Sequence, residues 1–129
     1  MRSVELSALR IFAFVRQTQG MKIPKSPVLT GRDAWIARLK NGETVSFREG
    51  GNSMTPRIKS RQKCTYSPVR SMEDVSIGDA VFCRVGSSYF THLITAIRDE
   101  QVQISNNHGH VNGWTHISNV FGKVIRIEN

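Results

Sequence analysis

The residues best suited to chemistry in this sequence are a serine in a glycine-led turn and a histidine farther along the chain. Ser53 lies within Gly50-Gly51-Asn52-Ser53-Met54-Thr55-Pro56. The two glycines permit backbone conformations closed to other residues, and Pro56 fixes a dihedral just after the serine, so the turn can hold the hydroxyl at a bend. Serine becomes a good nucleophile only when a base takes its proton. His92, in Thr91-His92-Leu93-Ile94, is the first candidate for that base.

These segments resemble the signal-peptidase/LexA-like serine peptidases, whose nucleophile lies in Gly-x-Ser-Met-x-Pro. One branch of that family uses a histidine base in a His-Arg-Val/Ile context, to which His92-Leu93-Ile94 is similar. Ile77-Gly78-Asp79-Ala80-Val81 is similar to the family's Gly-Asp-x-Val strand entry, and Val120-Phe121-Gly122-Lys123-Val124-Ile125 is similar to its ending. The resemblance covers residues 43 to 127. It implies a mainly β, LexA/signal-peptidase-like antiparallel fold with short N-terminal helices.

The resemblance also implies roles for individual residues. Ser53 and His92 would form the catalytic dyad, with Met54 and Pro56 beside the substrate. Some family members carry an oxyanion-binding serine where this chain has glycine before Asn52. Backbone N–H groups around the nucleophile, or the Asn52 side chain, could take that role.

The chain departs from the family where an acid should support the dyad. The family's Gly-Asp-Asn-Asn-Pro-x-x-Asp segment corresponds here to Ser-Asn-Asn-His-Gly-His-Val-Asn, so that Asn106 and Asn112 occupy the acidic positions. An amide can orient an imidazole but cannot stabilise an imidazolium as a carboxylate does. Changing the acid of a triad to its amide can cost about four orders of magnitude in turnover. Turnover is therefore expected to be slow or absent.

Each of these residues also has an ordinary structural explanation. A glycine-rich turn ending in Ser-x-x-Pro is most often only a turn. A strand histidine is more often half-buried and bonded to a neighbour than a base. Strand alternation places His92 on one face with Phe90, Ile94 and Ala96, and such apolar surroundings lower an imidazole pKa in either case.

Two functional classes therefore stay open. The first is a serine peptidase acting on a peptide or protein through Ser53 and His92. The second is a peptidase-like binding module that receives a peptide, a protein or nucleic acid without turnover. Because LexA-like domains dimerise, the resemblance also implies a homodimer.

Composition bounds the architecture. A chain of 129 residues can bury a core without metals or disulfides. We expect an N-terminal helix and linker over residues 1 to 30, with the helix at 3–17, and a β domain over residues 31 to 129. Cys64 and Cys83 are expected to be free, buried thiols, and no cofactor or metal is expected, although His108, His110 and His116 form a short histidine-rich tract. The sequence shows no membrane-spanning run and no secretory signal, which favours a soluble, cytoplasmic protein.

Positive charge is concentrated in the first half of the chain. Residues 1 to 63 hold thirteen Lys and Arg against four acids, whereas residues 64 to 129 hold five against six. Arg57, Lys59, Arg61 and Lys63 alternate, so on an extended segment they would share one face. Such a stripe can attract nucleic acid or an acidic partner, or can simply be a solvated strand edge.

Hydrophobic patterning predicts one domain helix and six strands. The helix covers 33–39 and is closed by Asn41-Gly42. The strands are expected near 44–47, 63–69, 80–85, 89–97, 101–105 and 120–127. Hairpin turns are expected at Gly86-Ser87-Ser88, Asp99-Glu100 and Asn112-Gly113.

Overall fold

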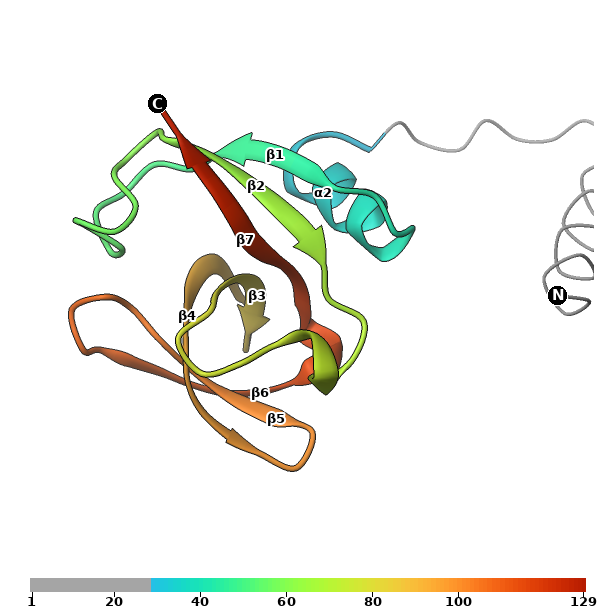
Figure 1. The fold of residues 1–129 in the computed structure, drawn as a ribbon, viewed down its shortest axis with the longest axis vertical. Helices are drawn as coiled ribbons and strands as arrows, with labels where there is room; N and C mark the ends of the chain where they lie inside the picture. Colours follow the sequence, from blue (N-terminus) through green and yellow to red (C-terminus); the bar gives the residue numbers. More distant parts are fainter. Residues whose placement is uncertain (1–28) are drawn as a thin grey trace, which may run out of the picture.

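The computed structural model describes residues 29 to 129, which form a mainly β domain with one helix (Figure 1). The predicted helix at 3–17 lies outside the described residues, as does nearly all of the linker. Among residues 29 to 129, no helix is long and apolar enough to cross a membrane. The elements are α2 (Gly31–Lys40), β1 (Val45–Arg48), β2 (Lys63–Pro68), β3 (Ala80–Val85), β4 (Ser88–Arg98), β5 (Gln101–Ser105), β6 (Val111–His116) and β7 (Val120–Glu128), with short 3₁₀ turns at Met72–Asp74 and Ile117–Asn119.

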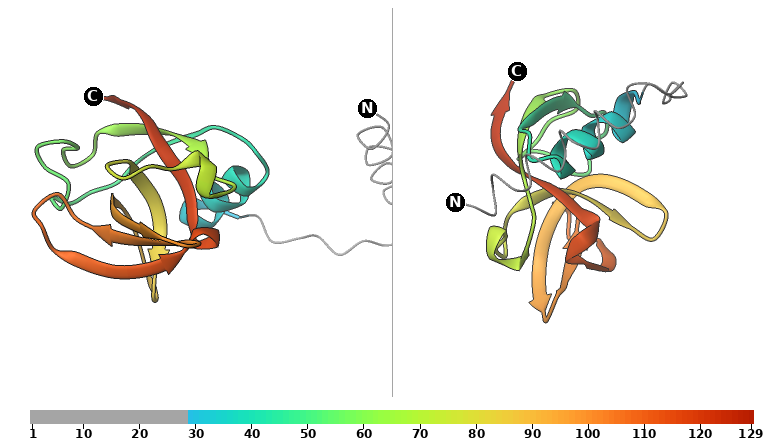
Figure 2. Two further views of the ribbon diagram at one scale, coloured as in Figure 1. Left: turned by 60° about the horizontal axis from the view of Figure 1, so that its bottom comes forward. Right: turned by 90° about the vertical axis from the view of Figure 1, so that its right-hand side faces the viewer.

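The strands form one antiparallel sheet in the order β1-β2-β7-β3-β4-β5-β6. The last strand of the described chain, β7, therefore lies inside the sheet between β2 and β3. The sheet curls so that β6 approaches β3, where the Thr115 hydroxyl donates a hydrogen bond of 2.8 Å to the Arg84 carbonyl. Figure 2 shows this curl, with β4, β5 and β6 wrapping below β7.

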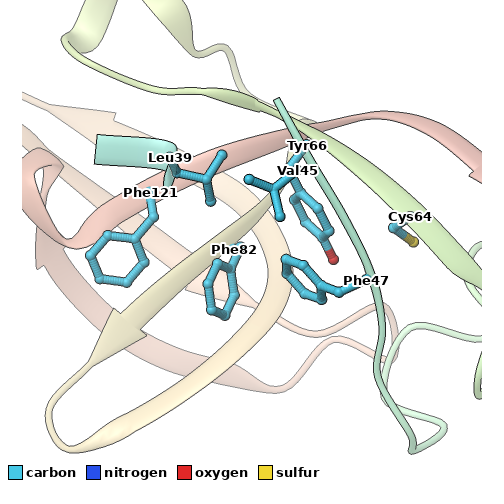
Figure 3. Close-up of a cluster of buried hydrophobic side chains, with 7 residues drawn as sticks. All are labelled: Leu39, Val45, Phe47, Cys64, Tyr66, Phe82 and Phe121. Carbon is cyan, nitrogen blue, oxygen red and sulfur yellow. The ribbon is translucent and has the colours of Figure 1, made fainter. Parts of the chain in front are cut away.

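One hydrophobic cluster lies between α2 and the β1, β2, β7 and β3 strands (Figure 3). The Phe47 ring stacks between Trp35, at 3.8 Å between centroids, and Tyr66, at 4.3 Å. Helix α2 contributes the buried Leu39, whose methyl groups would lie 3.0 and 3.1 Å from a Cβ placed on Gly122. A glycine in β7 therefore lets the helix pack directly on the sheet.

A second cluster fills the space enclosed by the curled β3, β4, β5 and β7 strands. Its members alternate along β3 and β5 because successive side chains of a strand point to opposite faces, and in β3 the intervening Phe82 is buried in the first cluster. The fully buried members of the second cluster include Val81, Cys83, Ile94, Val102 and Ile104. Since Cys64 belongs to the first cluster and Cys83 to the second, both thiols are buried and free, as predicted.

The strand predictions are confirmed except at one place. All six predicted strands and the helix are present within one or two residues, and so are the turns at 86–87 and 99–100. The predicted turn at Asn112-Gly113 is wrong, because both residues lie inside β6. There Gly113 pairs with Ile104 and Val111 pairs with Ser105, which leaves Asn112 as the extra residue of a β-bulge. Asn-Gly signals a hairpin turn, but a bulge needs the same backbone freedom, and Gly113 has a φ of 136°.

Candidate active site

Ser53 lies in the long loop between β1 and β2, which is closed on itself by backbone hydrogen bonds. The N–H of Arg61 donates to the carbonyl of Glu49 at 2.8 Å and closes the base of the loop. Within it, Gly51 adopts a φ of 111°, in a region that favours glycine, and its N–H donates to the Ser60 hydroxyl at 3.1 Å. The predicted glycine-led bend is therefore present, and it holds Ser53 at the surface.

The Ser53 hydroxyl meets the ring of His92, which lies on β4. The distance between Ser53 Oγ and His92 Nε2 is 3.0 Å. His92 is only 5% exposed, and the Phe90 ring stacks on the imidazole at 4.1 Å between centroids. Burial lowers the pKa of His92 below its ordinary value of 6.5, which keeps the ring neutral near pH 7 and able to accept a proton. The structure thus brings together the two residues that the sequence singled out.

Asn112 orients the imidazole from its other side. Its Oδ1 lies 2.7 Å from His92 Nδ1, so Nδ1 carries the proton and donates it to the amide oxygen. This tautomer leaves the lone pair of Nε2 facing the Ser53 hydroxyl. The β-bulge at Asn112 turns this side chain toward the ring, which is a common use of bulges beside active sites. Ser53, His92 and Asn112 therefore form one continuous hydrogen-bonded chain.

The loop between β5 and β6 holds the nucleophile loop in place. The backbone N–H of Asn107 donates to the Ser53 carbonyl at 2.9 Å, and its side-chain amide donates to the Thr55 carbonyl at 3.1 Å. His108 Nε2 lies 2.9 Å from the Asn52 carbonyl. In Figure 1 and in the left view of Figure 2 these two loops lie at the same side of the molecule. No sequence motif indicated that this loop would hold the Ser53 loop in place.

Asn106 supports the site only through the shape of that loop. Its Oδ1 accepts hydrogen bonds from the backbone N–H groups of His108, at 2.8 Å, and His110, at 3.0 Å. Of the two asparagines at the family's acidic positions, only Asn112 hydrogen-bonds to His92.

Donors for an oxyanion are available in the backbone next to Ser53. Among the described residues, the N–H groups of Ser53 and Met54 donate to no other group, because the turn bonds begin at the N–H of Thr55. Asn52 is exposed, and its carbonyl accepts from Thr55 and His108. A role for the Asn52 side chain in oxyanion binding stays a prediction.

A cavity of about 140 Å³ opens beside Ser53 and extends between the nucleophile loop and β2 and β4. Met54 is 5% exposed and lines this cavity, and its place beside a substrate stays a prediction. Pro56 is exposed and is not part of the lining.

The wall of the cavity contains the carboxyl group of Glu49, which the sequence alone did not indicate as a site residue. The Tyr66 hydroxyl lies 2.7 Å from the Thr91 hydroxyl, which in turn donates to Glu49 Oε1 at 2.6 Å. Burial raises the pKa of Glu49 above its ordinary value, and the hydrogen bonds from Thr91 and Tyr66 only partly oppose this effect. No lysine or arginine among the described residues lies within 4.0 Å of this carboxylate.

Glu49 should make the protein less stable as pH rises. Its raised pKa means that the folded chain binds this proton more tightly than the unfolded chain. The contribution of Glu49 to the free energy of unfolding is therefore highest at pH values below its pKa in the unfolded chain. This contribution falls as the pH rises from there through its higher pKa in the folded chain. Glu49→Gln should remove this loss, so the variant should exceed wild type in stability at neutral pH and lose that advantage in acid. Urea unfolding of both proteins across this pH range measures the difference, and a pH-independent difference would contradict it.

The basic residues after Ser53 do not form the predicted stripe. Arg57 and Arg61 lie in turns and Lys59 lies between those turns, Arg61 has a φ of 68°, and only Lys63 begins a strand. The segment is not extended because the loop forms hydrogen bonds within itself. For example, the N–H of Ile58 donates to the carbonyl of Met54 at 2.9 Å. Alternation along the sequence therefore does not become one face of a strand.

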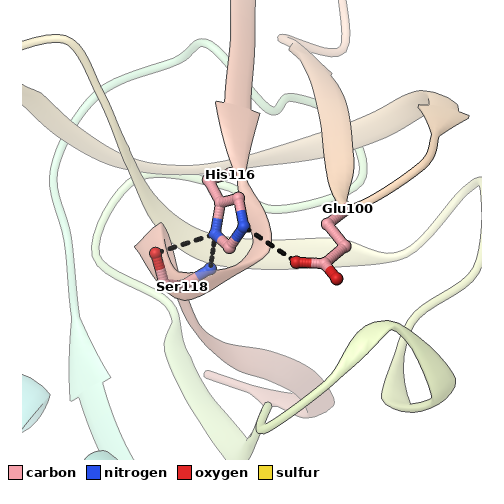
Figure 4. A network of polar contacts seen from close by, with 3 residues as sticks. All are labelled: Glu100, His116 and Ser118. Atoms are coloured by element: carbon pink, nitrogen blue, oxygen red, sulfur yellow. Dashed lines mark hydrogen bonds and ion pairs between the residues drawn. The ribbon is translucent and has the colours of Figure 1, made fainter.

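The histidine-rich tract is spread over different structures. His116 is the last residue of β6. Its Nε2 lies 3.1 Å from Glu100 Oε1, and its Nδ1 lies 2.9 Å from the Ser118 hydroxyl (Figure 4). The N–H of Ser118 also donates to Nδ1 at 3.0 Å, so His116 caps the following 3₁₀ turn. His108 belongs to the clamp on the nucleophile loop. Within residues 29 to 129, no three histidine, cysteine or acidic side chains gather as a metal site would require.

Comparison with protein-family models finds no match for this sequence. Comparison with curated proteins finds no match either.

Proposed function

We propose that the protein is a serine peptidase of the Ser-His type, related to the signal-peptidase/LexA-like family. The observation that carries the proposal is the chain of hydrogen bonds from Ser53 through His92 to Asn112, at 3.0 and 2.7 Å. A nucleophile, a base within hydrogen-bond reach and a third group that orients the base are the parts that acyl transfer requires. A buried neutral imidazole and free backbone N–H groups beside the serine complete the arrangement.

The reaction follows from these positions. His92 Nε2 takes the proton of Ser53 as its Oγ attacks the carbonyl carbon of a peptide bond. The N–H groups of Ser53 and Met54 stabilise the oxyanion of the tetrahedral intermediate. When the C–N bond breaks, the imidazolium gives its proton to the leaving amine. Water, deprotonated by the same ring, then hydrolyses the acyl-serine ester and restores the hydroxyl.

Asn112 sets the expected rate of this reaction. In a serine triad whose aspartate is changed to asparagine, the large loss of turnover reflects the wrong tautomer. Here the amide presents Oδ1 to the ring, so the productive tautomer is retained. The amide carries no negative charge, however, and does not stabilise the imidazolium as a carboxylate would. We therefore propose slow turnover.

The neutral amide also favours a second candidate function. A domain that binds a peptide or protein in the same cavity without cleaving it would not need a carboxylate beside His92. In that case Ser53 and His92 would be hydrogen-bonding groups of a binding site.

Labelling with a fluorophosphonate separates the two functions. The probe should modify wild type at Ser53, as shown by mass spectrometry of the digested protein, and should not modify Ser53→Ala. Ser118→Ala is the matched control, because Ser118 also contacts a histidine that is paired with an acid. This control should label like wild type. A folded wild type that stays unlabelled across the range of imidazole titration, about pH 5 to 8, would exclude the peptidase and favour the binding domain.

A further inference from the structure

The cavity beside Ser53 is lined by both apolar and polar side chains. Ser53 and the two glycines before it stand at one side, while Met54 and Phe90 supply apolar surface. In the same wall, the Tyr66 hydroxyl hydrogen-bonds to the Thr91 hydroxyl, which donates to the carboxyl group of Glu49. The cavity therefore combines apolar surface with a carboxyl group.

We propose that this cavity binds the side chain of a lysine or arginine in a peptide substrate. This lysine or arginine is the residue whose carbonyl Ser53 attacks, and its charged end pairs with the Glu49 carboxylate. The inference rests on the proposed peptidase function and adds a substrate class to it. The lining by Ser53 itself places the cavity next to the reacting bond.

The size of the cavity suits such a side chain. Its volume of about 140 Å³ exceeds the roughly 30 Å³ that one water molecule occupies in the liquid. It can therefore hold several heavy atoms. The methylene groups of lysine or arginine would contact Met54 and Phe90, while the charged end reaches the carboxylate, as long basic side chains commonly divide their contacts.

The charge of Glu49 decides between a cationic and an apolar occupant. An apolar side chain would strip water from the carboxylate and give nothing in return, which is costly. A cation instead forms a charge-assisted hydrogen bond with it. The binding of a cation would also lower the raised pKa of Glu49 and keep the group ionised. Lys59 lies at the exposed rim and comes no closer than 4.0 Å to this carboxylate.

Two peptidyl diphenyl phosphonates test the substrate class. One carries the lysine side chain next to phosphorus and the other carries its uncharged isostere, norleucine. In each, Ser53 Oγ forms a bond to phosphorus as one phenoxide leaves, and the serine proton passes to His92. Wild type should react with the lysine probe at least about tenfold faster than with the norleucine probe, as expected for a hydrogen bond to a charged group. Glu49→Gln should lose most of this ratio, whereas Glu43→Gln, at an exposed carboxylate, should keep it.

A binding measurement separates failure of this inference from failure of the peptidase proposal. The peptides acetyl-Ala-Ala-Lys-amide and acetyl-Ala-Ala-norleucine-amide are titrated into Ser53→Ala while the backbone amide signals of Gly50 and Gly51 are followed by NMR. Tighter binding of the lysine peptide, lost on adding Glu49→Gln, would support the cation site even if no phosphonate reacts. Equal rates and equal affinities for the charged and uncharged compounds would overturn it, as would a preference that survives Glu49→Gln.

Discussion

Replacement of His92 with alanine is expected to slow fluorophosphonate labelling of Ser53 by about 10³-fold, within the range that a positioned general base provides. The effect is large because Nε2, at 3.0 Å from Ser53 Oγ, is the only base that hydrogen-bonds to this hydroxyl among the described residues. The second-order rate constant of labelling is the quantity to measure. His116→Ala, which removes the exposed histidine beside Ser118, should leave it unchanged.

The pH dependence of labelling gives an independent check of the same base. Only the neutral imidazole can take the serine proton, so the rate should rise with pH and reach a plateau above the pKa of His92. Because burial lowers this pKa, the midpoint should lie below 6.5. A labelling rate that survives in His92→Ala within a factor of ten, or that does not depend on pH in wild type, would exclude His92 as the base.

Asn112→Asp is expected to accelerate labelling by roughly tenfold to a hundredfold, less than the full effect of a triad acid because the correct tautomer is already held. A carboxylate 2.7 Å from Nδ1 would stabilise the imidazolium that forms as the serine reacts. The same negative charge should raise the pKa of His92. The midpoint of the pH profile should therefore move upward, and the acceleration should be greatest at pH values above it.

Asn119→Asp is the matched control for this change. It adds the same charge at an asparagine whose side chain donates to the Thr115 hydroxyl and does not contact His92. The rate and the midpoint should both stay close to those of wild type. If Asn112→Asp changes neither quantity, the amide does not act on the imidazole, and the hydrogen-bonded chain has no catalytic role.

Most of the fold could be predicted from the sequence because its elements obey simple periodic rules. The strands at 80–85 and 101–105 were expected at the positions observed, since the first is a short apolar run between turns and the second alternates polar and apolar residues. Strand β6 was not predicted because the Asn112-Gly113 pair within it is also the strongest short signal for a hairpin turn. Whether such a pair bends a chain back or bulges within a strand depends on how the neighbouring strand is paired, which local sequence does not encode.

The candidate site was predicted only where a short motif identifies its residues. Ser53 and His92 followed from their motifs, but Glu49 is an acid before two glycines and looks like part of an exposed loop. It becomes notable only when the fold of the loop turns its side chain toward Thr91 on β4. The clamp by Asn107 likewise depends on contacts between segments far apart in sequence. The basic stripe failed for the converse reason, because alternation has a meaning only on an extended backbone.

The place of β7 in the sheet has a consequence for the order of events during synthesis. The hairpin that carries Ser53 and the meander that carries His92 are joined in the sheet through β7, which is made after both. Until β7 has left the ribosome, the nascent chain therefore exposes two unpaired strand edges, one on β2 and one on β3. Pairing distant segments late is slow and leaves intermediates open to aggregation. The Ser53 loop and the strand that carries His92 should therefore be held together in the sheet only after β7 has paired with β2 and β3.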